Sequence, residues 1–442
     1  MKNPGRTVIL GAGPTGLGAA HRFHELGFDN YIVVEASATP GGLSASRRDP
    51  HGFTWDLGSH VHFSRYPYYH EVLDRVLPAN EWTRHERKAW VWLAEGLVPY
   101  PIQANVCQLP PAIRDRVRGE LAEPRSADPP ASFAQWLVAT FGPTLADVFM
   151  YPYNEKAWGY PAERLAINWI ADRVSPPSDQ RRGDDARWGP NSQFRFPRHG
   201  TGSLWQAVAR QLDPLRIAYG ERVCEIDLGR RLIRSETGRH WTYDTVITTA
   251  PLDVISGLCR GLLPTSIRAA AGLMHSSVHV VGVGLRGGRT PWSRGKSWVY
   301  FPQADIPFHR LTVFSDYSPS LVPDPGCWSL LLEVSETPHK PVAAAQLPPA
   351  ILEALRRIGC LGPDAEVISI WHERVEHGYP TPSLNRDDDL RVILADLEAH
   401  DVYSRGRFGG WKYEVSNQDH CFMQGVEVVN RLLLDEPETV FR

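Results

Sequence analysis

The sequence predicts an α/β protein: a discontinuous, Rossmann-like parallel sheet interrupted by a helical insert and by an antiparallel-sheet domain. Three observations predict this architecture. Within residues 7–35, a strand, a glycine-rich turn, a helix and a second strand follow one another. Helical periodicity dominates residues 110–180, and four strand-like runs fall between residues 277 and 335. A βαβ unit combined with separate helix-rich and strand-rich segments is typical of an interrupted α/β fold.

The composition is that of an ordinary globular chain. Hydrophobic residues make up 42% of the 442 residues and charged residues 22%, which excludes a disordered or fibrous protein. The net charge of -3 gives no electrostatic reason to expect nucleic acid or a membrane surface as a partner. No apolar run reaches the ~18 residues of a membrane span, and the first residues do not form a signal-peptide pattern. We therefore expect a cytoplasmic protein.

The first βαβ unit carries a complete dinucleotide-binding motif. Gly11 permits a tight turn after the strand Thr7–Leu10, and Gly13 lets the backbone approach a pyrophosphate. Gly16 allows the helix to pack closely on the strand. The amides at the start of the helix, around Thr15, then face the phosphates.

The segment after the second strand favours FAD over NAD. Glu35 lies 24 residues after Gly11, where a carboxylate accepts hydrogen bonds from an adenosine ribose and repels a 2′-phosphate. The glycine pair that ends at Gly42, followed by Leu43, gives the backbone room beside a longer cofactor. Far downstream, Thr245–Pro251 reads as another buried strand, so the nucleotide-binding sheet is expected to be discontinuous.

These patterns divide the chain into three predicted domains. Residues 185–202 are polar and rich in glycine and proline, which predicts a loop, and residues 425–434 predict a last helix that returns to the first domain. We expect an FAD-binding domain (1–90, 186–262 and 399–442), a helical insert (107–185) and an antiparallel-sheet substrate domain (91–106 and 263–398).

Five further segments contain long, specific sequence blocks: Phe149–Trp158, Trp188–Asn191, Tyr300–Arg310, His377–Pro382 and Ser404–His420. Together they resemble the UDP-galactopyranose mutase family, and most closely its eukaryotic branch. The blocks span nearly the whole chain in the family's order.

The resemblance implies a fold, a cofactor and a reaction. The reaction is a ring contraction of a nucleotide-diphosphohexose from pyranose to furanose through a reduced-flavin N5–sugar adduct, with no net redox change. FAD in its reduced form is the implied cofactor, with NAD(P)H as the candidate reductant. The implied substrate is a UDP- or GDP-hexose, and a homo-oligomer is the candidate assembly.

The resemblance also assigns residues to the substrate. A diphosphate needs cations that bind two oxygens each, and Arg310 and Arg407 match the family's arginines at this position. The other substrate positions fall into three groups: Tyr317, Tyr379 and Tyr413 for the diphosphate; Asn154, Trp158, Asn191 and Asn417 for the sugar; and Tyr100, Gln103 and Phe149 for the base, with Tyr300 in the same set.

The flavin side is assigned in the same way. His60 matches a histidine beside the isoalloxazine and Arg173 an arginine close to it, where a cation favours the anionic reduced flavin. Arg87 matches a position that faces the reductant. Further cofactor contacts are implied for Gly42, Leu43, Gly58, Ser59, Val223 and Gln418.

The sequence departs from the family at several positions. Ser59 replaces the second glycine of a Gly-Gly-His turn, and its side chain restricts the backbone, which predicts altered flavin handling. Ile102 replaces a phenylalanine that sandwiches uracil, which predicts a changed base preference. Ala89 replaces a serine that meets the phosphate of NADPH. An insert between Tyr317 and Trp328 is absent.

Two alternatives remain open at this stage. One is an oxidoreductase like the flavin amine oxidases or desaturases, which needs an apolar substrate tunnel that the arginines and tyrosines argue against. The other is a mutase homologue or nucleotide-sugar binder that has lost FAD through Ser59. No metal site is expected, because the six cysteines form no CxxC pair and His372, Glu373 and His377 lack the HExxH spacing.

Overall fold

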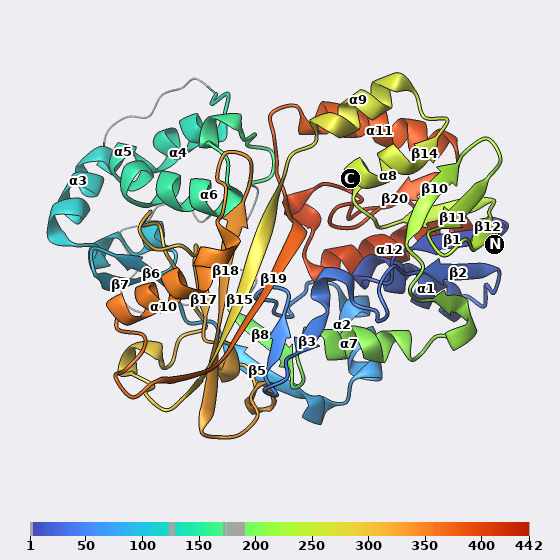
Figure 1. Cartoon of the computed structure of the whole chain (residues 1–442). Helices are drawn as coiled ribbons and strands as arrows, with labels where there is room; N and C mark the ends of the chain where they lie inside the picture. Colours follow the sequence, from blue (N-terminus) through green and yellow to red (C-terminus); the bar gives the residue numbers. More distant parts are fainter. Residues whose placement is uncertain (1–2, 123–128, 171–173, 175–190, 442) are drawn as a thin grey trace.

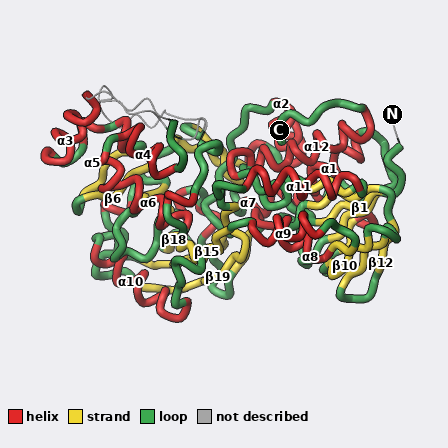
Figure 2. The backbone as a smooth tube through the Cα atoms, turned by 90° about the horizontal axis from the view of Figure 1, so that it is seen from above, coloured by secondary structure: helices red, strands yellow, loops and turns green. Residues whose placement is uncertain are grey.

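The fold was analysed in a computed structural model, which describes residues 3–122, 129–170, 174 and 191–441. Two sheets lie in separate halves of the molecule (Figures 1 and 2). None of the helices in the described part of the chain has the length and apolar character that a bilayer-spanning helix needs.

The first half is built on a five-stranded sheet in the order β20-β13-β1-β2-β9, and neighbouring strands pair in parallel. Its strands are β1 (Thr7–Leu10), β2 (Tyr31–Val34), β9 (Ile217–Ala218), β13 (Thr245–Thr248) and β20 (Val402–Ser404). The strands are largely buried, because helices cover both faces of the sheet. The prediction of a discontinuous Rossmann-like sheet is confirmed.

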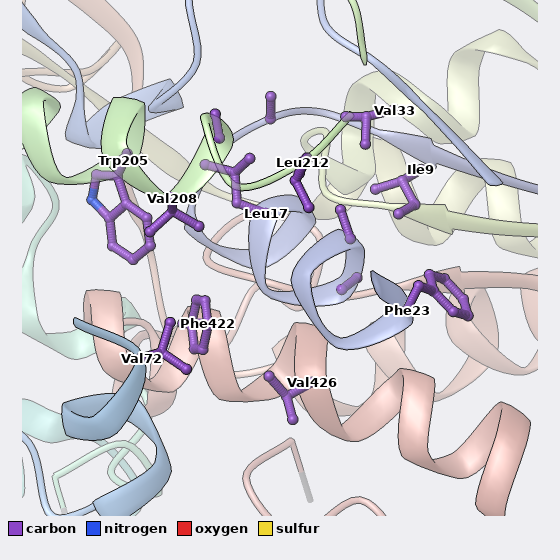
Figure 3. Close-up of a cluster of buried hydrophobic side chains, with 14 of the residues drawn as sticks. Ile9, Leu17, Phe23, Val33, Val72, Trp205, Val208, Leu212, Phe422 and Val426 are labelled. Carbon is purple, nitrogen blue, oxygen red and sulfur yellow. The ribbon is translucent and has the colours of Figure 1, made fainter. Parts of the chain in front are cut away.

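One face of this sheet is covered by four helices: α1 (Pro14–Glu25), α2 (Pro67–Val76), α7 (Thr201–Ala209) and α12 (Gln418–Leu434). Figure 3 shows Leu17 of α1, Trp205 of α7 and Phe422 of α12 packing together in this core. The last helix begins at Gln418, earlier than the predicted 425. It joins the first half as expected.

The other face is covered by α8 (Leu252–Leu258), α9 (Pro264–Gly272) and α11 (Arg386–Ala399), beside a small sheet in the order β12-β11-β10-β14. The strands of that sheet are β10 (Val223–Asp227), β11 (Leu232–Ser235), β12 (His240–Thr242) and β14 (Cys259–Arg260). The structure differs here from the expected domain boundaries, which place both α9 and nearly all of α11 in the substrate domain (263–398). Residues of α9 and α11 pack in one core with Val8 and Val246, because their apolar faces complete the parallel sheet.

The second half contains a seven-stranded sheet in the order β19-β15-β18-β17-β16-β6-β7. Its strands are β6 (Ala89–Leu93), β7 (Gly96–Pro99), β15 (His275–Arg286), β16 (Trp298–Tyr300), β17 (Arg310–Thr312), β18 (Cys327–Glu336) and β19 (Glu366–Pro380), and α10 (Leu347–Arg357) packs on it. The predicted strands are present, but the sheet is mixed, because β16 pairs with β6 in parallel. The long strands β15 and β19 run along the junction of the two halves (Figure 1).

The helical insert comprises α3 (Pro111–Ala122), α4 (Phe133–Phe141), α5 (Pro143–Leu145), a π-helical turn (Ala146–Met150) and α6 (Tyr151–Trp158). Two small antiparallel pairs, β3 (Ser46–Arg48) with β4 (Thr54–Asp56) and β5 (Trp82–Glu86) with β8 (Gln193–Pro197), lie near the junction. The predicted loop at 185–202 is therefore wrong in part, since Gln193–Pro197 pairs with β5. Residues 185–190 lie outside the described residues.

Candidate active site

A single cavity of about 1380 Å³ extends from the glycine-rich turn after β1 to the seven-stranded sheet. This volume exceeds the roughly 300–1,000 Å³ of a typical ligand pocket, so it has room for a cofactor and a second ligand together. The predicted site residues that line it are Gly11, Gly13, Thr15, Glu35, Gly42, Leu43, Gly58, Ser59, His60, Arg87, Tyr100, Gln103, Phe149, Asn154, Trp158, Asn191, Val223, Tyr300, Arg310, Tyr379, Arg407, Tyr413, Asn417 and Gln418.

Two predicted residues, Gly16 and Tyr317, lie away from the cavity wall. Gly16 lies behind the wall, where a Cβ would come within 1.8 Å of the carbonyl oxygen of Gly11. Tyr317 is not part of the wall, because its ring is buried among Phe194, Phe196 and Phe314. Arg173 lies outside the described residues.

The dinucleotide end of the cavity is built by β1, α1 and β2. Gly11 has a φ of +103°, and the N-terminus of α1 after Gly13 carries no side-chain cap. Glu35 accepts the amide hydrogens of Ala12 at 2.6 Å and Ser37 at 2.7 Å, which holds its carboxylate at the end of β2. Uncapped amides at a helix start bind phosphate, and a fixed carboxylate binds ribose hydroxyls. These residues therefore fit a dinucleotide such as FAD.

The turn that contains Ser59 is formed without strain at the serine. Gly58 has a positive φ of +149°, whereas the φ of Ser59 is not positive. This turn therefore accepts a side chain at position 59 without backbone strain, and the altered flavin handling expected from Ser59 stays a prediction. The amide of Ser59 donates to Glu333 at 2.9 Å.

An ion pair joins two neighbouring strands on the cavity wall. Arg310 of β17 is in register with Glu333 of β18 and donates to it from Nη2 at 2.6 and 2.7 Å and from Nε at 3.0 Å. The Tyr379 hydroxyl also donates to Glu333, at 3.2 Å. Burial alone raises the pKa of Glu333, but Arg310 outweighs it and lowers this pKa to about 2. Arg310 is thus held in place by an internal anion.

Sequence analysis missed Glu333. It lies in β18, inside a strand whose neighbours are apolar, and its side chain is only 3% exposed. A buried charge needs a partner of opposite charge. An acidic residue inside an apolar run is therefore the signal in the sequence that could have indicated a buried ion pair at Glu333. The pairing of β18 with β17, which supplies the partner, is not visible in the sequence.

Arg407 has a different environment. Its Nε and Nη2 donate to the carbonyl of Gly378 at 3.2 and 2.9 Å, and its Nη1 donates to Ser416 Oγ at 2.9 Å. The guanidinium lies 5.2 Å from the ring centroid of Tyr379 and 5.8 Å from that of Tyr413. Within the residues that the structure describes, no carboxylate pairs with Arg407. Neutral acceptors orient this cation but leave its charge available for an anionic ligand.

Two histidines of the cavity wall, His60 and His309, are uncharged near neutral pH. Burial, with smaller contributions from Arg407 and Arg310, lowers the pKa of His60 to about 4 against the opposing effect of Glu333. Burial likewise lowers the pKa of His309 to about 3. The charged groups that act on His60 are therefore the guanidinium groups of Arg310 and Arg407 and the carboxylate of Glu333.

Aromatic rings line the cavity between the helical insert and the sheet. Phe149 stacks on Tyr153 with centroids 5.2 Å apart and an interplanar angle of 10°, and Tyr100 lies 4.8 Å from Tyr300. Ile102 is fully buried in the core of the insert and does not reach the cavity. Ile102 is therefore not part of the cavity wall, and the change of base preference expected from it stays a prediction. The aromatic rings of the wall offer faces on which a planar group can stack.

The remaining polar candidates are already engaged on one side. Asn154 donates to Met150 O at 2.8 Å, and Arg87 hydrogen-bonds to Asn191. Gln418 Oε1 accepts from Trp205 at 2.6 Å. Asn417 is the exception: it is the N-cap residue of α12, but its side chain makes no capping hydrogen bond. The hydrogen bonds hold the side chains of Asn154, Asn191 and Gln418 at the cavity edge.

The chain was compared with known proteins. A family model described as flavin containing amine oxidoreductase matches residues 14–420. A crystal structure of reduced UDP-galactopyranose mutase is 40% identical, with a TM-score of 0.95 over 99% of this chain and 96% of that chain.

Two solved structures with lower sequence identity are similar to this chain in fold alone, and one further protein matches a part of its sequence. A putative protoporphyrinogen oxidase from Exiguobacterium sp. 255-15 is 17% identical, with a TM-score of 0.75 over 99% of this chain and 100% of that chain. Cyclohexylamine oxidase from Brevibacterium oxydans IH-35A is 16% identical, with a TM-score of 0.69 over 97% and 98%. An L-amino acid oxidase of Cerastes cerastes is 30% identical over 121 residues, which cover 23% of this chain and 22% of the oxidase.

Proposed function

The chain belongs to the flavin-containing amine oxidoreductase family and, within it, to the UDP-galactopyranose mutases, and we propose that it interconverts the pyranose and furanose forms of a UDP-linked hexose. The observation that carries this proposal is the 40% identity to a reduced UDP-galactopyranose mutase over 99% of the chain. The cavity supports it, because a dinucleotide cradle and an unneutralised arginine share one space.

FAD is the cofactor, and its site is the dinucleotide end of the cavity. The glycine turn after β1 and the start of α1 bind the pyrophosphate, and Glu35 binds the ribose. Leu43, Val223 and Gln418 line the same region. The bound flavin, in its reduced form, supplies the nucleophile for the anomeric carbon. We propose NAD(P)H as the reductant, supported by Arg87 on the cavity wall.

The chain's own contribution to the reaction is to bind and stabilise the diphosphate. Arg407 supplies a full positive charge, whereas Glu333 offsets the charge of Arg310. Tyr379 and Tyr413 flank Arg407 and present hydroxyl groups as neutral donors. A pre-oriented cation stabilises the negative charge that collects on the nucleoside diphosphate as the glycosidic bond breaks.

The aromatic slot and the amides position the rest of the substrate. Phe149 and Tyr100 offer faces on which a base stacks, and Gln103 lies beside them on the wall. Asn154, Asn191 and Asn417 are available to read sugar hydroxyls, and Trp158 forms an apolar wall. Holding the base and the diphosphate also positions the hexose, which is attached to the terminal phosphate, and this lowers the entropic part of the barrier.

The structure gives less support to the alternatives. The unneutralised positive charge of Arg407 would repel the cationic substrate of an amine oxidase. A flavin-less protein is disfavoured because the turn at Ser59 is unstrained and the α1 N-terminus is left uncapped.

The test is an anaerobic assay of the purified protein with UDP-galactopyranose after reduction with dithionite, in parallel with the oxidised protein. Product NMR should show the furanose only with the reduced, flavin-containing protein. A GDP-hexose in a parallel reaction measures base preference. Absence of furanose from both nucleotide sugars would contradict the proposal.

A further inference from the structure

His377 and Asp253 form a contact between the two halves of the molecule. His377 Nε2 lies 3.1 and 3.0 Å from the two carboxylate oxygens of Asp253. A carboxylate only accepts, so Nε2 carries the proton and donates. Asp253 belongs to α8 on the parallel sheet, whereas His377 belongs to β19 of the mixed sheet. Burial alone raises the pKa of Asp253, but the hydrogen bond from His377 lowers it below its ordinary value.

A β-bulge places His377 at this contact. Ser276 of β15 is paired with Tyr379 and Val278 with Val375, so three residues of β19 lie opposite a single residue of β15. The extra residues, Glu376 to Gly378, re-aim the strand, which is a known use of bulges near functional sites. Gly378 is required there, because a Cβ would come within 2.4 Å of Val278 Cγ2.

The same bulge holds Arg407. The carbonyl of Gly378, directly after His377, accepts from both Nε and Nη2 of Arg407 at 3.2 and 2.9 Å. The connection thus runs from Asp253 to His377, through one peptide unit to Gly378, and on to the arginine whose charge is not neutralised within the described residues. Asp253 and Arg407 belong to the first half, and the bulge between them belongs to the second.

Aromatic neighbours fix the ring of His377. His275 stacks on it with centroids 4.2 Å apart and an interplanar angle of 22°. Phe408 and Trp411 meet it edge-on at 5.1 and 6.1 Å. One ligand atom of each of Asp253, His275 and His377 lies within 4.8 Å of the others, so the carboxylate faces both imidazoles, with His377 Nε2 the nearer at 3.0 Å.

We propose that His377 is a positioning residue for Arg407: its hydrogen bond to Asp253 locks the β19 bulge, and the bulge carbonyl aims the guanidinium at the substrate's diphosphate. This inference rests on the proposed function for the identity of the ligand. It predicts a role in binding the diphosphate and none in binding the base.

Two variants of His377 separate the hydrogen bond from the ring. His377→Phe keeps the ring and its stacking but loses the donor, whereas His377→Gln keeps a donor near the Nε2 position. We expect His377→Phe to weaken UDP binding to the oxidised holoenzyme roughly three- to tenfold. Uridine, which has no phosphate, should bind within about twofold of wild type. His377→Gln should restore UDP binding to within about twofold.

A double-mutant cycle tests whether His377 acts through Arg407. Arg407→Lys keeps the positive charge but loses the planar guanidinium group, whose Nε and Nη2 both donate to the carbonyl of Gly378. If the two residues act as a unit, His377→Phe combined with Arg407→Lys should bind UDP within about twofold of Arg407→Lys alone. Glu373→Gln is the matched control, because it breaks another contact between the halves, the 3.6 Å Arg47–Glu373 pair, without touching Arg407.

Three results would overturn the proposal: equal weakening of UDP and uridine by His377→Phe, multiplicative effects in the double variant, or the same loss in Glu373→Gln. If the double variant does not fold, the comparison of UDP binding with uridine binding in His377→Phe decides the outcome. If the wild-type protein forms furanose but the double-mutant cycle shows no coupling between His377 and Arg407, this inference alone is refuted. Wild-type protein that binds UDP but forms no furanose refutes the proposed function alone.

Discussion

Glu333 of β18 holds Arg310 of β17 through three hydrogen bonds of 2.6 to 3.0 Å, and the two residues are direct partners in the sheet register. The same carboxylate accepts the amide of Ser59 and the hydroxyl of Tyr379. One buried acid therefore connects the turn at the cofactor end of the cavity with two groups of the proposed diphosphate site. The net charge offered to a diphosphate comes mainly from Arg407.

Glu333→Gln tests this division of charge. The amide still accepts hydrogen bonds but no longer offsets Arg310, so we expect the unfolding free energy to fall by about 1–3 kcal/mol. UDP binding at low salt should become tighter by roughly threefold, because a negative charge near the diphosphate is removed. Calorimetric titration with UDP and thermal unfolding measure both effects, and Glu373→Gln is the surface control. Weaker UDP binding at unchanged FAD content would contradict the assignment.

Stability should depend on pH through the buried histidines. Burial lowers the pKa of His60 to about 4 and those of His62 and His309 to about 3, below the ordinary 6.5. The unfolded chain then binds more protons below pH 6.5, so stability is full above that pH and falls as the pH drops toward 4 and below, by about 1.4 kcal/mol per unit for each histidine. Unfolding midpoints at pH 7, 6 and 5 measure this slope.

His309→Gln should make that slope shallower, whereas His240→Gln, at an exposed position in β12, should leave it unchanged. An equal slope in the wild type and in His309→Gln would show that His309 is charged in the folded state.

Gly16→Ala should reduce the FAD content. A Cβ at this position would lie 1.8 Å from the carbonyl of Gly11, so the turn after β1 must open and the start of α1 must move. The ratio of flavin absorbance to protein absorbance in the purified protein measures the loss. Gly119→Ala, in the exposed part of α3 with no atom within 4 Å of the new Cβ, should keep full FAD and gain up to about 1 kcal/mol of stability. Full FAD occupancy in Gly16→Ala would contradict the proposed pyrophosphate site.

Phe149→Ala should weaken UDP binding through the base. Phe149 stacks on Tyr153 at the cavity wall, and loss of one stacking face costs roughly tenfold in affinity. Binding of inorganic pyrophosphate, which has no base, should stay within about twofold of wild type. Equal weakening of both ligands would place the base elsewhere.

Local sequence pattern predicted the parts of the fold that depend on local structure. The glycines after β1, Glu35 and the runs that became β15 and β18 were recognisable because turn geometry and strand burial leave direct traces in the sequence. Packing partners leave no such trace. The sequence therefore did not reveal that Ile102 and Tyr317 face the core, that α9 and α11 complete the parallel sheet, or that Glu333 meets Arg310.

The central claim is that the chain catalyses an isomerisation with no net redox change. The most direct measurement is the amount of furanose formed from UDP-galactopyranose per electron pair, with dithionite limited to one equivalent of bound FAD under anaerobic conditions. We predict many furanose molecules per electron pair, with the flavin still reduced at the end. A yield of one product per electron pair, or reoxidation of the flavin in step with product, would contradict the account.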